Sequence, residues 1–313
     1  MHKLIIGCGY LGLRAAQVWR ARGDRVTALT RSTERAEQLR AEGIEPVVGD
    51  VLVRPSLAKL PEVETVLYAV GLDRNSGASR REVYVTGLAN VLSQMAGRAR
   101  RMIYVSSTSV YGQDSGEWVD ETSLCEPDAE NGRICLEAEQ TARRHPAVFG
   151  GASAGGPGLM SLNVLRLAGI YGPQRLLRRT ELLHGGVPLE GRADAWLNLI
   201  HVDDAVRAVI ACEERGRPNE TYLVCDNRPA RRSEYFAMLA SLIGAPEPRF
   251  EASAGEAPSC GEPSGGEPLR SLLNLNKRCC NRKLREELGV ELAFPTFAEG
   301  LPQALSPATL KAL

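Results

Sequence analysis

Three glycines near the amino terminus have the spacing of a turn that can bind a dinucleotide. They lie in Gly7-Cys8-Gly9-Tyr10-Leu11-Gly12, between the apolar run Leu4–Ile6 and a helical pattern. In such a turn Gly7 permits the tight bend, Gly9 leaves room for a pyrophosphate, and Gly12 lets the helix pack closely on the strand. Free N–H groups and the positive dipole end at the helix start would bind the phosphates. We therefore predict a dinucleotide site here, the alternative being a glycine-rich structural turn.

The residues after the next predicted strand, Val26–Leu29, indicate which dinucleotide is bound. An NAD site usually carries an acidic residue about 20 residues beyond the turn, where it binds the ribose 2′-hydroxyl. Here the strand is followed by Thr30-Arg31-Ser32, with no acid. Arg31 could pair with a 2′-phosphate, and Ser32 could add a hydrogen bond. We therefore expect NADP(H), whereas the alternative for Arg31 is a solvated surface side chain.

Two later strand ends supply further candidates for cofactor binding. Asp50 and Val51 follow the short strand Val47–Val48, and an acid at this point could accept a hydrogen bond from the adenine amino group. Asp50 could equally fill a turn position. Ala69-Val70-Gly71 lies at the end of the strand predicted over Val63–Val70, where the carboxyl end of the sheet would meet the cofactor.

The elements that must position these residues alternate between strand and helix. Helical patterns cover residues 11–22 and 34–41, and the strand-like runs are apolar throughout. Such runs are typical of a parallel sheet covered on both faces. We predict an α/β fold, a Rossmann-type doubly wound parallel sheet with a smaller C-terminal substrate lobe. Its seven strands are expected at Leu4–Ile6, Val26–Leu29, Val47–Val48, Val63–Val70, Met102–Val105, Val164–Leu167 and Thr221–Val224.

Two stretches have the composition of loops. Residues 146–160 are rich in Gly, Ala and Pro, and we expect a loop there, centred on 150–158. Residues 246–268 combine Pro, Gly and Glu with few apolar side chains. They cannot bury enough apolar surface to offset the entropy of ordering, so we expect a mobile loop, above all over 252–267.

Composition excludes several classes of partner. The chain of 313 residues carries 38 basic and 38 acidic side chains, so its formal charge is zero. That balance favours neither nucleic acid nor an anionic membrane, and no apolar run approaches the roughly 18 residues of a membrane-spanning helix. Eight cysteines without a CxxC pair, and four scattered histidines, indicate reduced thiols and no metal site. We expect a cytoplasmic protein with a small-molecule substrate.

Five segments together resemble the extended short-chain dehydrogenases/reductases, the NAD(P)-dependent epimerases and dehydratases of sugar nucleotides. They are the glycine turn, VGDV at 48–51, YVSSTSVYG at 104–112, LRLAGIYGP at 165–173 and IHVDD at 200–204. The resemblance covers nearly the whole chain. It implies a dinucleotide domain at 1–173 and 197–226 and a smaller substrate-binding lobe at 174–196 and 227–313. A homodimer is an assembly that the resemblance allows.

The resemblance also assigns roles to individual residues. Ser107 matches the family serine that hydrogen-bonds the carbonyl or hydroxyl of the substrate. Ser106 and Ile170 lie in the matching motifs and are expected beside the cofactor. The HVDD segment would sit at a helix start, where Asp suits an N-cap. His201 is therefore expected to be a structural residue rather than a catalyst.

The chain departs from the family where the family has its proton-transfer pair. Family members carry YxxxK on the helix after the serine strand, with Tyr as general acid/base and Lys as its partner. Alignment on Gly132 and Glu139 places Asn131 and Cys135 at those two positions. Asn has no proton to exchange near neutral pH, and an apolar helix face would raise the pKa of the cysteine.

Other differences accompany this loss. The glycine turn is one residue shorter than the usual GxxGxxG, and Tyr84 and Gly169 stand where family members often have asparagine. Tyr111 lies one turn beyond Ser107 and could take over proton transfer, although packing of the strand end is the stronger alternative for it. Arg133 sits beside the lost tyrosine position.

The sequence thus predicts an NADP(H)-binding, atypical short-chain dehydrogenase/reductase. It would oxidise, reduce or epimerise a small hydroxylated substrate, with a sugar nucleotide as one candidate. Ser107 and Tyr111 are the candidate catalytic residues. The missing Tyr/Lys pair keeps two alternatives open: a non-catalytic NADP(H)-binding redox sensor or partner-binding protein, and a structural subunit of a heterodimer.

Overall fold

The computed structural model describes residues 1–149, 159–176, 180–251 and 276–306. Its centre is a seven-stranded sheet in which every neighbouring pair is parallel, in the order β3-β2-β1-β4-β5-β7-β12. The winding reverses between β1 and β4, so the prediction of a doubly wound, Rossmann-type sheet is confirmed. The strands are β1 (His2–Ile6), β2 (Arg25–Thr30), β3 (Glu45–Val48), β4 (Val63–Tyr68), β5 (Ala99–Ser107), β7 (Ser161–Leu167) and β12 (Thr221–Val224).

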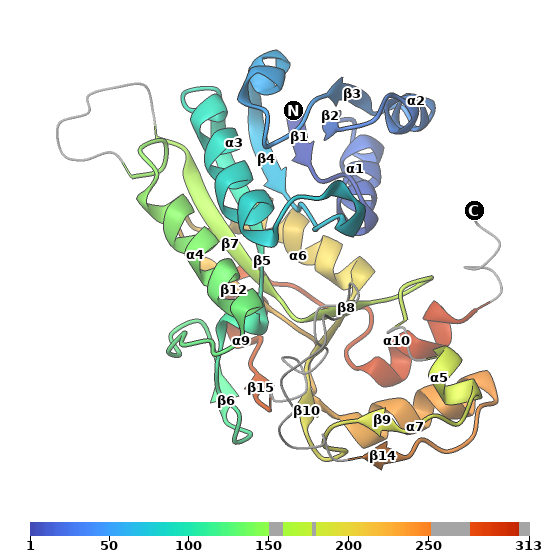
Figure 1. The fold of residues 1–313 in the computed structure, drawn as a ribbon. Helices are drawn as coiled ribbons and strands as arrows, with labels where there is room; N and C mark the ends of the chain where they lie inside the picture. The colour runs from blue at the N-terminus through green and yellow to red at the C-terminus, as the bar shows by residue number, and fades with distance from the viewer. Residues whose placement is uncertain (150–158, 177–179, 252–275, 307–313) are drawn as a thin grey trace.

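Helices cover both faces of the sheet (Figure 1). On one face, α1 (Tyr10–Ala21), α6 (Val202–Arg215) and α9 (Arg282–Leu288) bury apolar side chains such as Trp19 and Val209 in one core. On the other face, α3 (Gly87–Met95) and α4 (Glu130–Arg144) form a second core. The short helix α2 (Thr33–Ala41) packs beside β3. Burial from both sides explains why the strands are apolar along their length.

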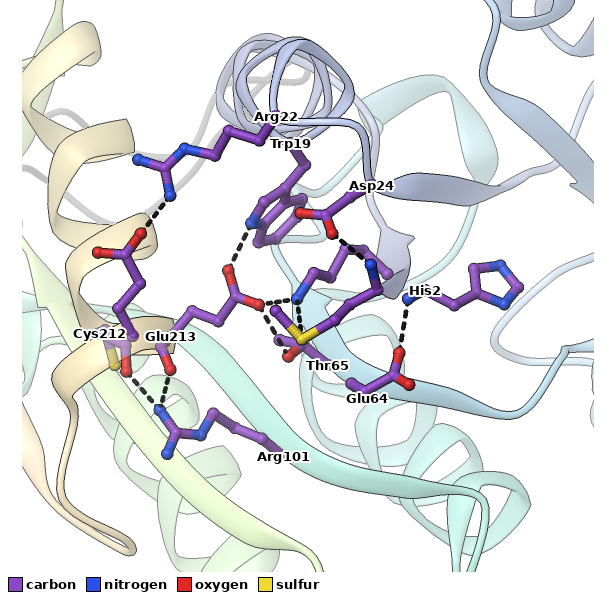
Figure 2. A network of polar contacts seen from close by, with 12 residues as sticks. His2, Trp19, Arg22, Asp24, Glu64, Thr65, Arg101, Cys212 and Glu213 are labelled. Carbon is purple, nitrogen blue, oxygen red and sulfur yellow. Dashed lines mark hydrogen bonds and ion pairs between the residues drawn. The ribbon is translucent and has the colours of Figure 1, made fainter.

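A polar network around Glu213 connects the end of α6 to α1 and to the strands of the sheet (Figure 2). Glu213 on α6 accepts hydrogen bonds from Trp19 Nε1 at 2.6 Å and from Thr65 Oγ1 at 3.3 Å. It also pairs with the fully buried Lys3. Arg101 of β5 donates to the backbone carbonyl of Glu213 at 2.6 Å. A buried ion pair needs additional side-chain partners to offset its desolvation. Here Trp19 of α1 and Thr65 of β4 supply them, while Arg101 holds the backbone at the end of α6.

A smaller lobe lies beyond the carboxyl end of the sheet (Figure 1). Its core includes Leu183, Leu189, Tyr235, Leu239 and Leu301. A parallel pair formed by β8 and β11 joins the lobe to the sheet. The elements of the lobe and its link are β8 (Gly169–Tyr171), α5 (Thr180–His184), β9 (Leu189–Glu190), β10 (Trp196–Leu197), β11 (Leu199–His201), β13 (Ala230–Arg231), α7 (Arg232–Ile243), β14 (Phe250–Glu251) and α10 (Phe297–Ala304).

One segment of the expected lobe packs on the sheet instead. Residues 276–292 fall within the expected range 227–313, yet Leu284, Leu288 and Val290 belong to the core between α1, α6 and the sheet. The two leucines are four residues apart and share one face of α9, which packs on α6 and β12. The remaining short elements are η1 (Arg54–Lys59), η2 (Arg74–Ser76), η3 (Glu82–Thr86), η4 (Thr108–Val110), β6 (Trp118–Val119) and β15 (Arg278–Cys279).

The two loop predictions fall largely outside the described residues. Residues 150–158 and 252–275 are not described, so both predictions stay open there. Within the second stretch, β14 corrects the expectation at its first residues, because it pairs with β9 and Phe250 packs against Phe236 of the lobe. In the described ranges, none of the helices has the length and apolar character that crossing a membrane requires.

Candidate dinucleotide and substrate site

A cavity of about 700 Å³ lies at the carboxyl edge of the sheet. Doubly wound sheets bind their ligands at this edge, where the helix starts and loops converge. Among the residues predicted from the sequence, Gly12, Ser32 and Tyr111 do not line the cavity. Those that do are Gly7, Gly9, Tyr10, Leu11, Arg31, Asp50, Val51, Ala69, Val70, Gly71, Ser106, Ser107 and Ile170.

The three glycines of the turn have different structural roles. Gly7 has a φ of +96°, and a Cβ there would lie 2.5 Å from the carbonyl oxygen of Ala69. A Cβ on Gly12 would lie 2.4 Å from the carbonyl oxygen of Gly7. Gly9 precedes α1 and has nothing within 4 Å of its Cβ position. The space that a pyrophosphate needs is therefore open beside the first N–H groups of α1, and the turn fits a dinucleotide.

Tyr10 connects the glycine turn to the segment that follows β8. Its hydroxyl donates to the carbonyl oxygen of Pro173 at 2.9 Å. Gly172, with a φ of +148°, allows this approach, because a Cβ there would lie 2.7 Å from the Tyr10 hydroxyl oxygen. The guanidinium of Arg175 lies 5.1 Å from the centre of the Tyr10 ring and lines the cavity. The contact places a cation at the cavity wall.

Two arginines line the cavity where β2 ends. Arg31 forms an exposed ion pair with Asp73, with 2.5 Å between Nη2 and Oδ2. Arg35, in the first turn of α2, reaches back to the carbonyl oxygen of Cys8 in the glycine turn at 3.4 Å. Both side chains line the cavity where β2 leads into α2. Two cations therefore lie beside the turn that would hold the phosphates.

Ser32 and Asp50 both bond to their local backbone. Ser32 Oγ accepts from the N–H of Arg35 at 3.0 Å and so caps α2. Asp50 Oδ1 accepts from the N–H of Leu52 at 2.8 Å, which is the turn role considered from the sequence. Asp50 nevertheless lines the cavity, and its contact with adenine stays a prediction.

The end of β5 brings two serines to the cavity. Ser107 Oγ accepts from the N–H of Ser109 at 3.1 Å, as the cap of η4. That bond uses a lone pair of the hydroxyl and leaves its proton available for a substrate oxygen. Ser106 Oγ instead donates to Glu139 on α4 at 2.6 Å, so it anchors the strand to the helix behind it.

Tyr111 is fully buried behind the cavity wall. Its hydroxyl donates to the carbonyl oxygen of Asp120 at 2.8 Å and accepts from Arg166 Nη1 at 2.9 Å. Burial raises the pKa of Tyr111. Both bonding directions of the phenol are thus taken, and it has no access to the cavity. Its position agrees with packing, the stronger alternative from the sequence, and we do not retain Tyr111 as a proton donor.

Helix α4 presents no proton-transfer pair to the cavity. Cys135 lines the cavity, whereas Asn131 does not. The Cys135 sulfur lies 4.0 Å from Asn131 Oδ1, and burial raises the pKa of the thiol, as expected for an apolar helix face. Gly132 allows the close approach of this helix, since a Cβ there would lie 2.3 Å from the carbonyl oxygen of Ser109.

The structure adds lining residues that sequence reasoning missed or left unassigned. Tyr84 comes from the π-helical turn η3, and its hydroxyl accepts from the N–H of Leu72 at 3.3 Å. Arg35 could have been found from its place in the first turn of the helix that follows β2. Tyr84 was identified from the sequence only as a departure from the family, and Arg175 lies just after the LRLAGIYGP segment. Tertiary packing brings both to the cavity.

His201 is structural, as expected. It is fully buried, and Nδ1 accepts from the N–H of Asp203 at 3.2 Å while Nε2 shares a hydrogen bond with Gln303 at 2.9 Å. His201 itself therefore caps α6, which corrects the expected Asp cap. Asp204 instead accepts from the N–H groups of residues 293 and 294, both at 2.8 Å. Over the described ranges, no three His, Cys, Asp or Glu side chains are grouped to hold a metal ion.

Comparison with known proteins agrees with this geometry. The chain is 28% identical to Protein YeeZ of Escherichia coli over 302 residues, covering 93% of this chain and 95% of YeeZ. It is also 28% identical to a 3-diazoavenalumate denitrifying reductase of Streptomyces over 318 residues, covering 96% and 99%. A conserved protein from Silicibacter pomeroyi, described as functionally unknown, has a solved structure that matches with a TM-score of 0.74 and 29% identity over 97% of both chains.

Residues 4–225 match the sequence profile described as the NAD dependent epimerase/dehydratase family. The matched range runs from β1 to the end of β12 and contains the glycine turn, the serine strand and the start of α6. The chain belongs to the NAD-dependent epimerase/dehydratase family.

Proposed function

We propose that the chain is an NADP(H)-dependent reductase that acts on a small carbonyl or hydroxylated substrate. The observation that carries the proposal is one cavity lined by the glycine turn, by Arg31 and Arg35, and by Ser107. A reduced nicotinamide, when bound, supplies the hydride. Ser107 would donate a hydrogen bond to the substrate oxygen. A relative named a reductase supports oxidoreduction over epimerisation, and a sugar nucleotide stays one candidate substrate.

The preference for NADP(H) rests on the two arginines. An exposed ion pair such as Arg31–Asp73 contributes little net energy. A 2′-phosphate can therefore replace Asp73 as the partner of Arg31, and a guanidinium binds phosphate oxygens through two N–H groups. Arg35 adds a second cation on the side of the glycine turn. β2 ends at Thr30 and is followed by Arg31 and Ser32, so this strand end offers no carboxylate for a ribose 2′-hydroxyl.

Calorimetric titration with NADPH and NADH tests the cofactor preference. We expect NADPH to bind more tightly to the wild type. Arg31→Ala and Arg35→Ala should each lose on the order of 1.5–3 kcal/mol of NADPH affinity, the value of a hydrogen bond to a charged group. Arg40→Ala, an exposed arginine at the far end of α2, is the matched control and should bind normally. Equal wild-type affinities for the two dinucleotides would contradict the preference.

NADPH oxidation measured by absorbance tests the reductase activity itself. The substrates would be a panel of aliphatic, aromatic and quinone carbonyls together with sugar nucleotides. Turnover with at least one class supports a reductase. A second function, NADP(H) binding without catalysis, is favoured by Asn131 and by the buried, high-pKa thiol of Cys135. It would replace the first if NADPH binds and no substrate in the panel is reduced.

We also infer a reducing, cytosolic environment for the protein. The inference is supported by the seven cysteines in the described part of the chain, all of which are free. The homodimer stays a prediction from the resemblance.

A further inference from the structure

Reduction of a carbonyl requires a proton for the oxygen, and α4 does not supply it. Cys135 lines the cavity, but burial raises the pKa of its thiol. Asn131 carries an amide, which exchanges no proton near neutral pH. Ser107 can bond to the substrate oxygen, yet a serine hydroxyl without an activating base is a weak acid. We therefore look for the donor on another element of the cavity wall.

Four tyrosines line the cavity, and three of them are poor donors. Tyr10 and Tyr68 each donate their proton to a backbone carbonyl, at 2.9 and 3.0 Å. Tyr104 is only 3% exposed, and burial raises its pKa well above the ordinary value. The fourth is Tyr84, which is half-buried and whose hydroxyl oxygen accepts from the N–H of Leu72 at 3.3 Å.

The bond from Leu72 suits a proton donor. It occupies a lone pair of the Tyr84 oxygen and leaves the hydroxyl proton without an acceptor among the described residues. When the proton leaves, the backbone N–H is already aimed at the oxygen that gains negative charge. A donor fixed in this way stabilises the charge without reorganisation.

The local backbone also directs Tyr84 towards the cavity. Tyr84 lies in the middle of η3, a π-helical turn immediately before α3. Single π-helical turns are frequent at functional sites, because the extra residue re-aims the side chains around it. The turn packs against α4, the helix that carries Cys135. Tyr84, Cys135 and Ser107 thus line one cavity from three adjacent elements.

We propose that Tyr84 is the proton donor of the reductase, an inference that rests on the proposed function. As the carbonyl carbon gains the hydride, its oxygen takes the electron pair of the broken C–O π bond. The O–H bond of Tyr84 breaks and its proton passes to that oxygen, giving an alcohol. The phenolate of Tyr84 then recovers a proton from water. Ser107 holds the oxygen in place throughout.

Three measurements on Tyr84→Phe test the proposal, with NADPH and a carbonyl that the wild type reduces. Positioned acid catalysis typically contributes roughly 10²–10⁴-fold, so kcat should fall by about that factor. The affinity for NADPH, measured by calorimetry without substrate, should stay within about twofold. A solvent deuterium isotope effect on wild-type kcat should disappear in the residual rate of the variant. Tyr235→Phe, which removes a buried hydroxyl in the smaller lobe, is the matched control and should behave as the wild type.

Nitration by tetranitromethane, detected by mass spectrometry, tests without an activity assay whether Tyr84 lies at the cofactor site. Tyr84 should be modified in the free protein and protected by saturating NADP(H), whereas the buried Tyr111 should resist under both conditions. A kcat of Tyr84→Phe equal to that of the wild type, or nitration of Tyr84 unaffected by NADP(H), would overturn the inference while the reductase stands. No wild-type turnover on any carbonyl would instead overturn the proposed function and the inference with it.

Discussion

Ser106 Oγ donates a hydrogen bond to Glu139 Oε1 across 2.6 Å, with both side chains buried. Glu139 in turn binds Arg166 on β7, with 2.8 Å between Nη2 and Oε2. Arg166 continues to the hydroxyl of Tyr111 at 2.9 Å. This chain of polar contacts ties the end of β5 to α4 and β7. It therefore fixes the position of Ser107, the next residue along the strand.

Removing Glu139 should destabilise the protein strongly. Glu139→Ala leaves the guanidinium of Arg166 buried without its carboxylate, and breaking a buried pair in this way typically costs about 3–5 kcal/mol. Urea unfolding would measure the loss. The control is Glu137→Ala on the same helix, which removes an exposed pair with Arg81 and should cost far less. Equal losses of stability in the two variants would show that the buried ion pair stabilises the protein no more than the exposed one.

Substitutions of two glycines in the turn should separate ligand binding from folding. Gly9→Ala adds a methyl group to open space, so the unfolding midpoint should stay near that of the wild type while NADPH affinity falls at least tenfold. Gly12→Ala forces a methyl group to within 2.4 Å of a backbone oxygen. Such overpacking typically costs about 1–3 kcal/mol of stability. Thermal melts and calorimetry would test the pair, and unchanged NADPH binding in Gly9→Ala would contradict the assigned phosphate site.

The turn and the sheet could be predicted because they depend on local sequence. Gly7, Gly9 and Gly12 each mark a backbone requirement that few other residues meet, and uninterrupted apolar runs mark strands buried on both faces. The strand after each helix then follows from the handedness of the connection. Arg31 could be predicted as a cavity residue for the same reason, since it directly follows β2.

The proton donor and the lobe boundary could not be predicted in this way. Tyr111 lies next to the serine strand in sequence, but a bond from Arg166 on β7 holds its hydroxyl away from the cavity. Tyr84 is distant in sequence from Ser107 and reaches the cavity through a π-helical turn, which has no simple sequence signal. The resemblance placed Leu284 and Leu288 in the lobe, and only their tertiary contacts show that they cover the sheet instead.

Asp226 should make stability depend on pH. Asp226 is 2% exposed, and burial raises the pKa of its carboxyl group to about 8. The carboxylates of Glu299 and Asp204 raise this pKa further, whereas the N–H and guanidinium of Arg228 lower it. A folded-state pKa above the unfolded one means that the folded protein holds the extra proton. The stabilisation is full below about pH 4, near the unfolded pKa. It is lost as pH rises towards 8, by at most about 1.4 kcal/mol per pH unit.

The variant Asp226→Asn isolates this effect. It keeps a neutral group at the site, so its stability should change less than that of the wild type between pH 5 and pH 8, and it should be the more stable protein above pH 8. Urea unfolding across the pH range measures both quantities. Asp194→Asn, at an exposed position, should keep the wild-type slope over the same range. Parallel profiles for the wild type and Asp226→Asn would show that Asp226 does not titrate in this window.

Substitution of Ser107 distinguishes a reductase from a non-catalytic sensor. If the cavity reduces a carbonyl, Ser107→Ala removes a hydrogen bond to the oxygen that gains charge, and loss of one such donor costs on the order of 10²-fold in kcat. NADPH affinity should not change, because the hydroxyl of Ser107 is assigned to the substrate oxygen and, among the described residues, bonds to the N–H of Ser109. Ser107→Thr retains a hydroxyl that can both cap η4 and bond to the substrate, so it should restore most of the rate. Ser161→Ala is the control: Ser161 begins the neighbouring strand β7, at the amino end of the sheet, and this variant should behave as the wild type. A sensor would instead keep its output in Ser107→Ala and lose it in Gly9→Ala, and that pattern would exclude the reductase.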